Sequence, residues 1–405
     1  MGNRKIVLAA LVLALGYSLY HPLPDGIAEP WKLRLLLLNT KFFRTFGYIG
    51  SLLGIATDLN IIRAGAEFSL ADRFRDPRVT VEDRTFDIHG AYEIKARVYR
   101  PKTQRDEALP CLVYFHGGGF VFMSVASHDA LTSYISAEAG IVVISVEYRL
   151  APEHVFPAAV NDCHMATRRI IENAAKLRVD VDRIGVAGDS AGGNLAAVVS
   201  LALRQDKSLN QQIKFQGLLY PALQSFDFRL PSYQTCSDVI PDILSARRMV
   251  EFWLYYFQGR LDNIEKVLKN QHISEWIRRS RYADYVNPEY LPGKYRSVRP
   301  PNAPPDPALS VQFNTFLRDE MANPLMADSL EGLPPTFILT GEYDVLRDEG
   351  FLYARRLRNG GVAVTHRHYD SGYHGFLSLL NTPVEPAITR QALADFIGFM
   401  KSNGF

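Results

Sequence analysis

The stretch Gly188-Asp189-Ser190-Ala191-Gly192 decides the fold class of this 405-residue chain. The apolar run 184–187 before it is typical of a buried strand, and the almost wholly apolar run 194–203 after it is typical of a helix packed under a sheet. A strained strand-to-helix turn requires glycines on both sides of its serine, because larger side chains would crowd the hydroxyl. We therefore predict that Ser190 is a nucleophile, although an ordinary glycine-rich turn is the alternative.

A second glycine-rich stretch, HGGGF at residues 116–120, follows the apolar run 112–115. Successive glycines let main-chain N–H groups approach the oxyanion that forms when a hydroxyl attacks a carbonyl. The predicted donors to this oxyanion are the N–H groups of Gly117, Gly118 and Ala191. Gly119 is the alternative donor, since the sequence does not show which glycines point inward. No Lys-Ser or Lys-Thr follows as in a phosphate-binding loop, and we expect His116 to orient the loop.

A serine nucleophile needs a histidine base and a carboxylate, which follow the serine along the chain in this class of fold. Asp344 follows the strand signal 335–339, and His374 follows the strand signal 362–369. Because the carboxyl ends of parallel strands meet at one edge of a sheet, we predict that both lie beside Ser190. Three neighbouring carboxylates are rivals for the role of the acid: Glu342, Asp348 and Asp370.

Strand signals recur at residues 79–88, 94–99, 112–115, 141–146, 184–187, 215–220, 335–339 and 362–369. Helical stretches lie between them, which predicts an α/β fold with a mostly parallel eight-stranded sheet and helices on both faces. Residues 226–330 show no clear strand and carry an aromatic stripe at helical spacing over 245–257. We predict that this insertion, with residues 25–75, forms a helical cap on a catalytic domain spanning 76–405. The aromatic stripe is either core packing or a wall of the substrate pocket.

Metal binding is an alternative role for His366 and His368, which share one face of the last predicted strand. A third ligand and the common zinc motifs are missing from the sequence, so we expect an exposed strand face and no metal or other cofactor. The three cysteines allow at most one disulfide, and Cys111 and Cys163 fall in elements that we expect to be buried.

Four motifs together resemble the hormone-sensitive-lipase branch of the α/β-hydrolases: HGGGF at 116–120, GDSAGGN at 188–194, EYRLAPE at 147–153 with Phe156-Pro157, and Asp344 with Leu346-Arg347-Asp348. Within that branch, the chain is similar over nearly its whole length to the arylacetamide deacetylase and neutral cholesterol ester hydrolase family. The resemblance implies an endoplasmic-reticulum membrane enzyme that hydrolyses esters and some amides of lipophilic compounds. It also implies that Ser190, Asp344 and His374 are catalytic and that residues 116–119 form the oxyanion motif.

The N-terminal sequence predicts a membrane anchor at residues 1–24. Arg4 and Lys5 precede the apolar run 6–20, and acidic residues follow it, so the positive-inside rule places the enzyme in the lumen as a single-pass type II protein. No small-residue cleavage site closes the run, which favours an uncleaved anchor over secretion. We expect the leucine-rich stretch 31–38 to lie in the membrane interface, where lipophilic substrates enter from the bilayer. No Asn-x-Ser/Thr sequon marks a luminal glycan.

These residues predict a two-stage acyl transfer to water, with a small lipophilic ester or amide as the substrate and membrane lipid as a partner. The formal charge of +2 and the lack of a dense basic patch give no reason to expect nucleic acid as a partner. The competing hypothesis is a ligand receptor on an inactive hydrolase fold, which would lack the base that His374 supplies here. Peptide hydrolysis shares the triad, but a capped pocket suits small esters better than an extended chain. The sequence leaves acyl-chain preference and oligomeric state open.

Overall fold

A computed structural model describes residue 16 and residues 22–405, apart from 53, 55–58, 62, 66–74, 89, 103–106, 207, 210–211, 241 and 297–301. Within this part of the chain, no helix combines the length and the hydropathy that a membrane span requires. The predicted anchor at residues 1–24 lies almost entirely outside the described residues, so it stays a prediction.

The eight predicted strands form one sheet in the order β1-β2-β4-β3-β5-β6-β7-β8. The β1–β2 and β2–β4 pairs are antiparallel and the remaining pairs are parallel, which confirms the mostly parallel sheet. The strands span Val79–Ile88 (β1), Tyr92–Pro101 (β2), Leu109–Phe115 (β3), Val142–Glu147 (β4), Val179–Asp189 (β5), Gln216–Leu219 (β6), Thr336–Tyr343 (β7) and Val364–Tyr373 (β8). β5 begins well before the predicted run, because Val179 already pairs with Leu109 although three of the next four residues, Asp180, Asp182 and Arg183, are polar.

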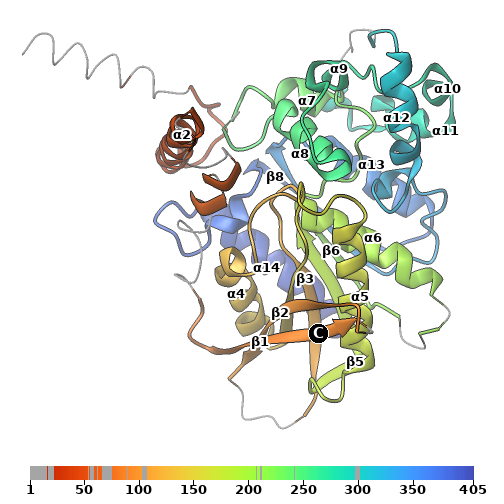
Figure 1. Cartoon of the computed structure of the whole chain (residues 1–405). Helices are drawn as coiled ribbons and strands as arrows, with labels where there is room; N and C mark the ends of the chain where they lie inside the picture. Colours follow the sequence, from red (N-terminus) through yellow and green to blue (C-terminus); the bar gives the residue numbers. More distant parts are fainter. Residues whose placement is uncertain are drawn as a thin grey trace, which may run out of the picture.

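Helices cover both faces of the sheet (Figure 1). Two helices pack on one face, α4 (Asp129–Ala139) and α14 (Ala387–Ser402), and three pack on the other, α5 (Ala158–Glu172), α6 (Ala191–Gln205) and α13 (Arg347–Asn359). Side chains alternate along each strand, so Val113 and Phe115 join the core with α5 and α6, whereas Leu112 and Tyr114 join the core with α4 and α14. The parallel strands are therefore apolar throughout. All three cysteines are buried, and none forms a disulfide.

Residues 226–330 contain several short helices and, among their described positions, no strand. The α-helices are α7 (Pro231–Thr235), α8 (Ala246–Gln258), α9 (Ile264–Leu268), α10 (Glu275–Arg278), α11 (Arg281–Tyr285) and α12 (Pro307–Arg318). Among the described residues of the whole chain, the 3₁₀ turns are η1 (Ala126–His128), η2 (Pro288–Tyr290), η3 (Gly293–Tyr295), η4 (Pro324–Met326) and η5 (Phe376–Leu379). The α7–α12 helices gather at one end of the sheet (Figure 1). Much of the aromatic stripe on α8 is core packing, because Tyr256 stacks on Phe120 with ring centroids 3.9 Å apart.

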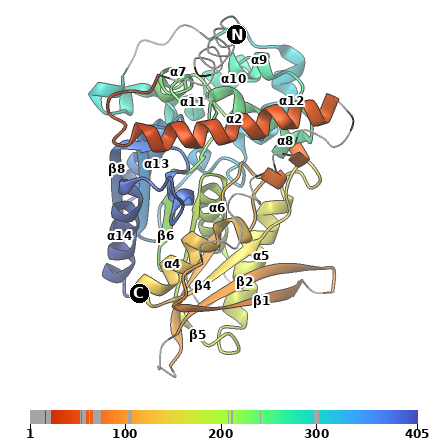
Figure 2. The ribbon, with the colours of Figure 1, turned by 90° about the vertical axis from the view of Figure 1, so that its left-hand side faces the viewer.

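One long helix, α2 (Pro30–Leu52), lies across the side of the molecule (Figure 2). Near its start, the Lys32 ammonium donates to the main-chain oxygen of Glu385 at 2.7 Å. Farther along, the Arg44 guanidinium pairs with the Asp242 carboxylate. The helix therefore links the C-terminal part of the chain to the helical segment 226–330.

Candidate active site

Ser190 occupies a strained turn between β5 and α6. Its backbone has a positive φ of 56°, a value that residues other than glycine rarely adopt. A Cβ atom on Gly188 would lie 2.3 Å from the Gly192 carbonyl, and one on Gly192 would lie 1.9 Å from the Phe115 oxygen. Both positions therefore require glycine, because other main-chain atoms approach them closely. This agrees with the prediction that the strand-to-helix turn needs a glycine on each side of Ser190.

The structure brings the three predicted residues Ser190, Asp344 and His374 together. The Nε2 atom of His374 lies 2.8 Å from the Ser190 hydroxyl oxygen, and its Nδ1 atom lies 2.9 Å from Asp344 Oδ2. Asp344 directly follows β7 and His374 directly follows β8, so the ends of two neighbouring parallel strands position them. Because Nδ1 faces a carboxylate, it carries the proton and leaves Nε2 able to accept the serine proton.

The three rival carboxylates make other contacts. Asp348 lies 3.0 Å from the Arg347 guanidinium and accepts the Ser232 N–H at 2.7 Å. Glu342 and Asp370 lie 3.0 and 3.8 Å from the Nε2 atom of His368, a histidine outside the triad. Among the described carboxylates, Asp344 is thus the one that His374 contacts.

The glycine-rich loop departs from the prediction at Gly117. The Gly117 N–H donates to Asp189 Oδ1 at 3.0 Å, so it is not directed at the nucleophile. Gly118 and Gly119 instead line the pocket beside Ser190, and both have a positive φ, 112° and 61°. The prediction of Gly117 as an oxyanion donor is therefore wrong for a physical reason, namely that a buried carboxylate already accepts its N–H. Gly119, the predicted alternative, replaces it in the proposal below.

Asp189, which sequence reasoning missed, is a buried carboxylate beside the nucleophile. It accepts from the Tyr114 hydroxyl at 2.8 Å, from the Gly117 N–H at 3.0 Å and from His128 Nε2 at 3.2 Å. Burial raises the pKa of Asp189, but the favourable contacts with His128 and Tyr114 outweigh burial and hold its pKa below the usual range. The ionised carboxylate therefore ties the glycine-rich loop to the serine turn. The signal in the sequence was its place next to the serine in GDSAG.

The contacts of His116 fit its predicted role, which is to orient the glycine-rich loop 116–120. Its ring stacks on Tyr148 with centroids 4.2 Å apart, and its Nδ1–H donates to the Gly117 carbonyl oxygen at 2.8 Å. The Tyr148 hydroxyl donates to the main-chain oxygen of His116 at 2.7 Å. Burial lowers the pKa of His116 to about 3, so the imidazole stays neutral.

A pocket of 270 Å³ opens onto Ser190 and His374. Leu36 and Phe43 of α2 form one part of its wall, and Phe252 of α8 forms another. The aromatic stripe on α8 therefore both packs the core and lines the pocket. A mostly apolar pocket with a few polar groups at one place is typical of a site for a small lipophilic molecule.

His366 and His368 do not form an exposed strand face, which corrects the prediction. The Thr340 hydroxyl oxygen lies 2.9 Å from His366 Nε2 and 2.9 Å from His368 Nδ1. Tyr295 covers this part of β8 and places its hydroxyl 2.9 Å from His368 Nε2. Burial lowers the pKa of His366 to about 3. A distant segment of the chain, which the strand pattern does not reveal, therefore covers these side chains.

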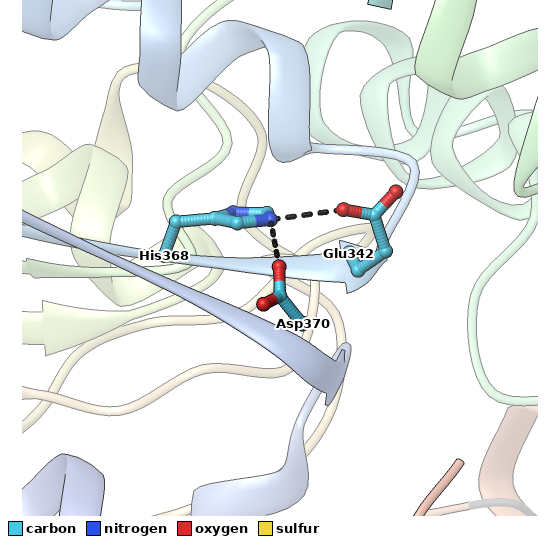
Figure 3. A group of neighbouring side chains, drawn as sticks. All are labelled: Glu342, His368 and Asp370. Carbon is cyan, nitrogen blue, oxygen red and sulfur yellow. Dashed lines mark hydrogen bonds and ion pairs between the residues drawn. The ribbon is translucent and has the colours of Figure 1, made fainter. Parts of the chain in front are cut away.

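Glu342, His368 and Asp370 place three atoms that can bind metals within 4.8 Å of one another (Figure 3). The Lys294 ammonium lies 3.4 Å from Glu342 and 3.9 Å from Asp370, and the Arg347 guanidinium lies 3.4 Å from Glu342. Both carboxylates thus have cationic partners, which would oppose a second cation at the same place. We describe the group as an ion-pair network and assign no metal to it.

Similar proteins place the chain in a family. Residues 112–274 and 308–378 match a family described as alpha/beta hydrolase fold. The chain is 39% identical to arylacetamide deacetylase of Bos taurus, over 92% of this chain and 93% of that protein. It is 34% identical to neutral cholesterol ester hydrolase 1 of Rattus norvegicus, over 100% of both. The chain belongs to the arylacetamide deacetylase and neutral cholesterol ester hydrolase family of α/β-hydrolases.

Solved structures of esterases share the fold of this family member. A hyperthermophilic esterase from the archaeon Pyrobaculum calidifontis has a TM-score of 0.65 and 33% identity, over 88% of this chain and 97% of that one. An ester hydrolase from the metagenome of Lake Arreo, complexed with a bipyridine phosphonate derivative, has a TM-score of 0.67 and 29% identity, over 94% of this chain and 99% of that one. The predicted fold and enzyme class are confirmed, and the chain is a hydrolase of the esterase type.

Gly192→Ala tests the close approach at the serine turn. A methyl group would overlap the Phe115 oxygen, so we expect a loss of about 3 kcal/mol in the free energy of unfolding and a lower Tm in a thermal scan. Gly398→Ala on α14 is the matched control, because a Cβ atom there meets nothing within 4 Å, and its Tm should be equal or slightly higher. A wild-type Tm for Gly192→Ala would contradict the close contact.

Proposed function

We propose that the chain hydrolyses carboxylic esters of lipophilic compounds through a covalent acyl-enzyme on Ser190. The observation that carries this proposal is the row of contacts, 2.8 and 2.9 Å long, that joins the serine hydroxyl to His374 and His374 to Asp344. Such a row at the floor of a pocket suits acyl transfer. The apolar lining of the pocket suits a substrate with an apolar acyl or alcohol group.

In the first stage, the Ser190 oxygen attacks the ester carbonyl carbon while His374 Nε2 takes the hydroxyl proton. Asp344 holds the imidazole in the required tautomer and stabilises its positive charge. The tetrahedral intermediate collapses when the bond to the alcohol oxygen breaks, and the alcohol leaves with the proton from His374. Water then attacks the acyl carbon with His374 as its base, which releases the carboxylic acid and restores Ser190.

We assign the oxyanion hole to the N–H groups of Gly118, Gly119 and Ala191. The two glycines line the pocket beside the nucleophile. Ala191 is the first residue of α6, where N–H groups lack an intrahelical acceptor and the helix dipole favours negative charge. Each such donor is worth on the order of a hundredfold in turnover in comparable enzymes.

The substrate class is proposed from the pocket and from the names of the relatives. One relative is named for the deacetylation of arylacetamides, and the other is named for the hydrolysis of cholesterol esters. We propose lipophilic esters as the main substrates and arylacetamides as a second class that the same acyl transfer would serve.

We also propose that residues 226–330 and 25–75 form a cap over the catalytic domain. Support comes from the pocket wall, to which α8 contributes Phe252 and Tyr255 and α2 contributes Leu36 and Phe43. Because these side chains lie above the nucleophile, the shape of the cap would set the preference for acyl chain and alcohol.

For its location, we propose the endoplasmic-reticulum membrane, with residues 1–24 as a signal anchor and the enzyme in the lumen. Support comes from Arg4 and Lys5 before the apolar run 6–20, and from Asp25 and Glu29 after it.

An engineered glycosylation site reports the topology, because the chain has no natural sequon. Arg260→Asn with Asp262→Thr creates one on the exposed stretch after α8. In translation with microsomes, we expect a mobility shift that endoglycosidase H reverses, and protection of the chain from added protease. The same changes in a chain without residues 1–24 should give neither effect. A full-length chain that is unmodified and digested would contradict a luminal enzyme.

Ser190→Ala should lower kcat for a short aryl ester by roughly 10⁴-fold or more, because the acyl acceptor is lost. Asp344→Asn should cost about 10⁴-fold, since the imidazole would adopt the wrong tautomer. Ser200→Ala, on the same helix with its hydroxyl bonded to the Ala196 carbonyl, is the matched control and should keep its activity. A fluorophosphonate should label the wild type and the control but not Ser190→Ala. An unlabelled, inactive wild type would favour the ligand receptor instead.

Asp189→Asn tests whether the buried carboxylate positions the oxyanion loop. An amide cannot accept from Tyr114, Gly117 and His128 as a carboxylate does. We expect kcat to fall about 100-fold with KM nearly unchanged, since oxyanion donors act mainly in the transition state. Asp162→Asn, at another buried carboxylate that bonds Arg149, is the control and should not give this pattern. Equal kinetic losses in the two variants would reduce Asp189 to a role in stability.

A further inference from the structure

The outer side of α2 carries a row of exposed apolar side chains. Of the eleven large apolar side chains that are exposed in the described part of the chain, seven belong to this helix: Trp31, Leu35, Leu38, Phe42, Phe46, Tyr48 and Ile49. All of these except Tyr48 follow one another at intervals of three or four residues, so they lie on one side of the helix, and we call them the α2 stripe. Water-soluble proteins rarely leave such a row uncovered, which indicates that something covers it.

Other sides of the same helix belong to the enzyme. Leu36, Thr40 and Phe43 line the pocket that contains Ser190 and His374. Leu33 and Leu37 are buried and join the core that includes α14. The α2 helix is thus the wall between the pocket and whatever covers the stripe. A helix with its side chains is about 10 Å across, so the two are separated by that distance.

The charges on α2 favour a bilayer as the covering partner. The helix has no acidic residue, and it has four basic ones: Lys32, Arg34, Lys41 and Arg44. The acidic partners of three of them lie outside the helix: Glu29 pairs with Lys32, and Asp242, whose side chain is only 10% exposed, pairs with Arg44 and Lys41. Four basic residues against these two acidic partners leave an excess of positive charge along α2, which suits anionic headgroups. Two copies packed stripe to stripe would instead bring their basic residues together without an acidic partner on the helix.

The order of residues along α2 also favours a bilayer as the covering partner. Trp31 lies at the first turn and Tyr48 near the last, and these two residue types concentrate at the level of lipid headgroups. In the sequence, the helix also shortly follows the apolar run 6–20 that is predicted to enter the membrane. A helix with an apolar side, basic flanks and a length of several turns is typical of one that lies in the plane of the interface.

We propose that the α2 stripe lies at the boundary of headgroups and acyl chains in a bilayer that contains anionic phospholipid, so that lipophilic esters pass from the bilayer along α2 into the catalytic pocket. This inference rests on the proposed ester hydrolysis at Ser190. The N-terminal anchor would only tether the chain, whereas the stripe would orient the enzyme with its pocket wall against the lipid. The substrate would then travel past one helix instead of crossing bulk water.

A tryptophan reporter tests the lipid contact in the full-length chain. The chain has three tryptophans, so Trp31→Phe with Trp276→Phe leaves Trp253, which is buried. Phe46→Trp then adds a reporter on the stripe, far from the anchor. In vesicles of phosphatidylcholine and phosphatidylserine with brominated acyl chains, we expect at least twofold quenching of this reporter.

The matched control places the reporter elsewhere. Val311 on α12 is 77% exposed, so Val311→Trp in the same background gives a reporter that the proposal keeps in water, and we expect no quenching. Quenching at position 46 no greater than at position 311 would overturn the inference, because the anchor alone holds the chain on the vesicle.

Kinetics test whether the stripe serves the substrate. In Phe42→Ser with Phe46→Ser, we expect turnover of a water-soluble short-chain ester within twofold of the wild type, since neither residue lines the pocket. Turnover of a long-chain ester embedded in phosphatidylserine-containing vesicles should fall at least tenfold. The control, Trp276→Ser with Val311→Ser, removes two exposed apolar side chains outside α2 and should keep both activities.

The outcomes separate this inference from the proposed function. Unchanged turnover of the embedded ester in the double variant would overturn the inference and leave ester hydrolysis intact. Loss of both activities in that variant would also overturn it, because the stripe would then be needed for the enzyme itself. A wild type that hydrolyses neither ester would overturn the proposed function. If the wild type sediments as a dimer without lipid and the double variant as a monomer, the stripe belongs to a second copy and the bilayer is excluded.

Discussion

The approach of Gly192 to the Phe115 carbonyl oxygen determines the geometry of the site. It seats the serine turn, between β5 and α6, directly against the end of β3, where the glycine-rich loop begins. At this distance the Asp189 carboxylate reaches the Gly117 N–H, so a buried charge adds to the steric fit. Ser190 and the glycine-rich loop are therefore held at a fixed separation by two independent means. In the proposed reaction this matters because preorganised donors need no rearrangement when charge develops in the transition state.

The sequence was sufficient to predict that Ser190, Asp344 and His374 come together, because each of them lies where an apolar strand ends. Asp344 directly follows β7 and His374 directly follows β8. Because these two strands are parallel neighbours, their carboxyl ends lie at the same edge of the sheet. The same logic did not reveal which glycine N–H points inward. That direction depends on Asp189, whose carboxylate accepts from Gly117 across the turn. Because glycine has no side chain, its residue type does not indicate which group accepts its main-chain N–H.

Contacts between distant segments also limited what could be predicted elsewhere. Alternation along β8 correctly places His366 and His368 on one face, but it does not show that Tyr295 covers that face. The start of β5 depends in the same way on its pairing with Leu109, which apolar character alone does not indicate. The apolar pattern therefore predicted the buried middle of each element well. It failed where polar groups are held by long-range hydrogen bonds or covered by a loop.

The exposed side of α2 differs from these cases because no contact within the described chain explains it. Leu33 and Leu37 already dock the helix, and the ion pair of Arg44 with Asp242 holds its second half. Leu35, Leu38 and Phe42 are 50%, 41% and 55% exposed, so polar residues in their place would cost the fold less than at a buried site and would improve solubility, since isolated apolar rows on a surface promote association. The row is also adjacent to the pocket wall formed by Leu36 and Phe43. Stability therefore accounts poorly for the row, whereas the proposed delivery of an apolar substrate to that wall would account for it.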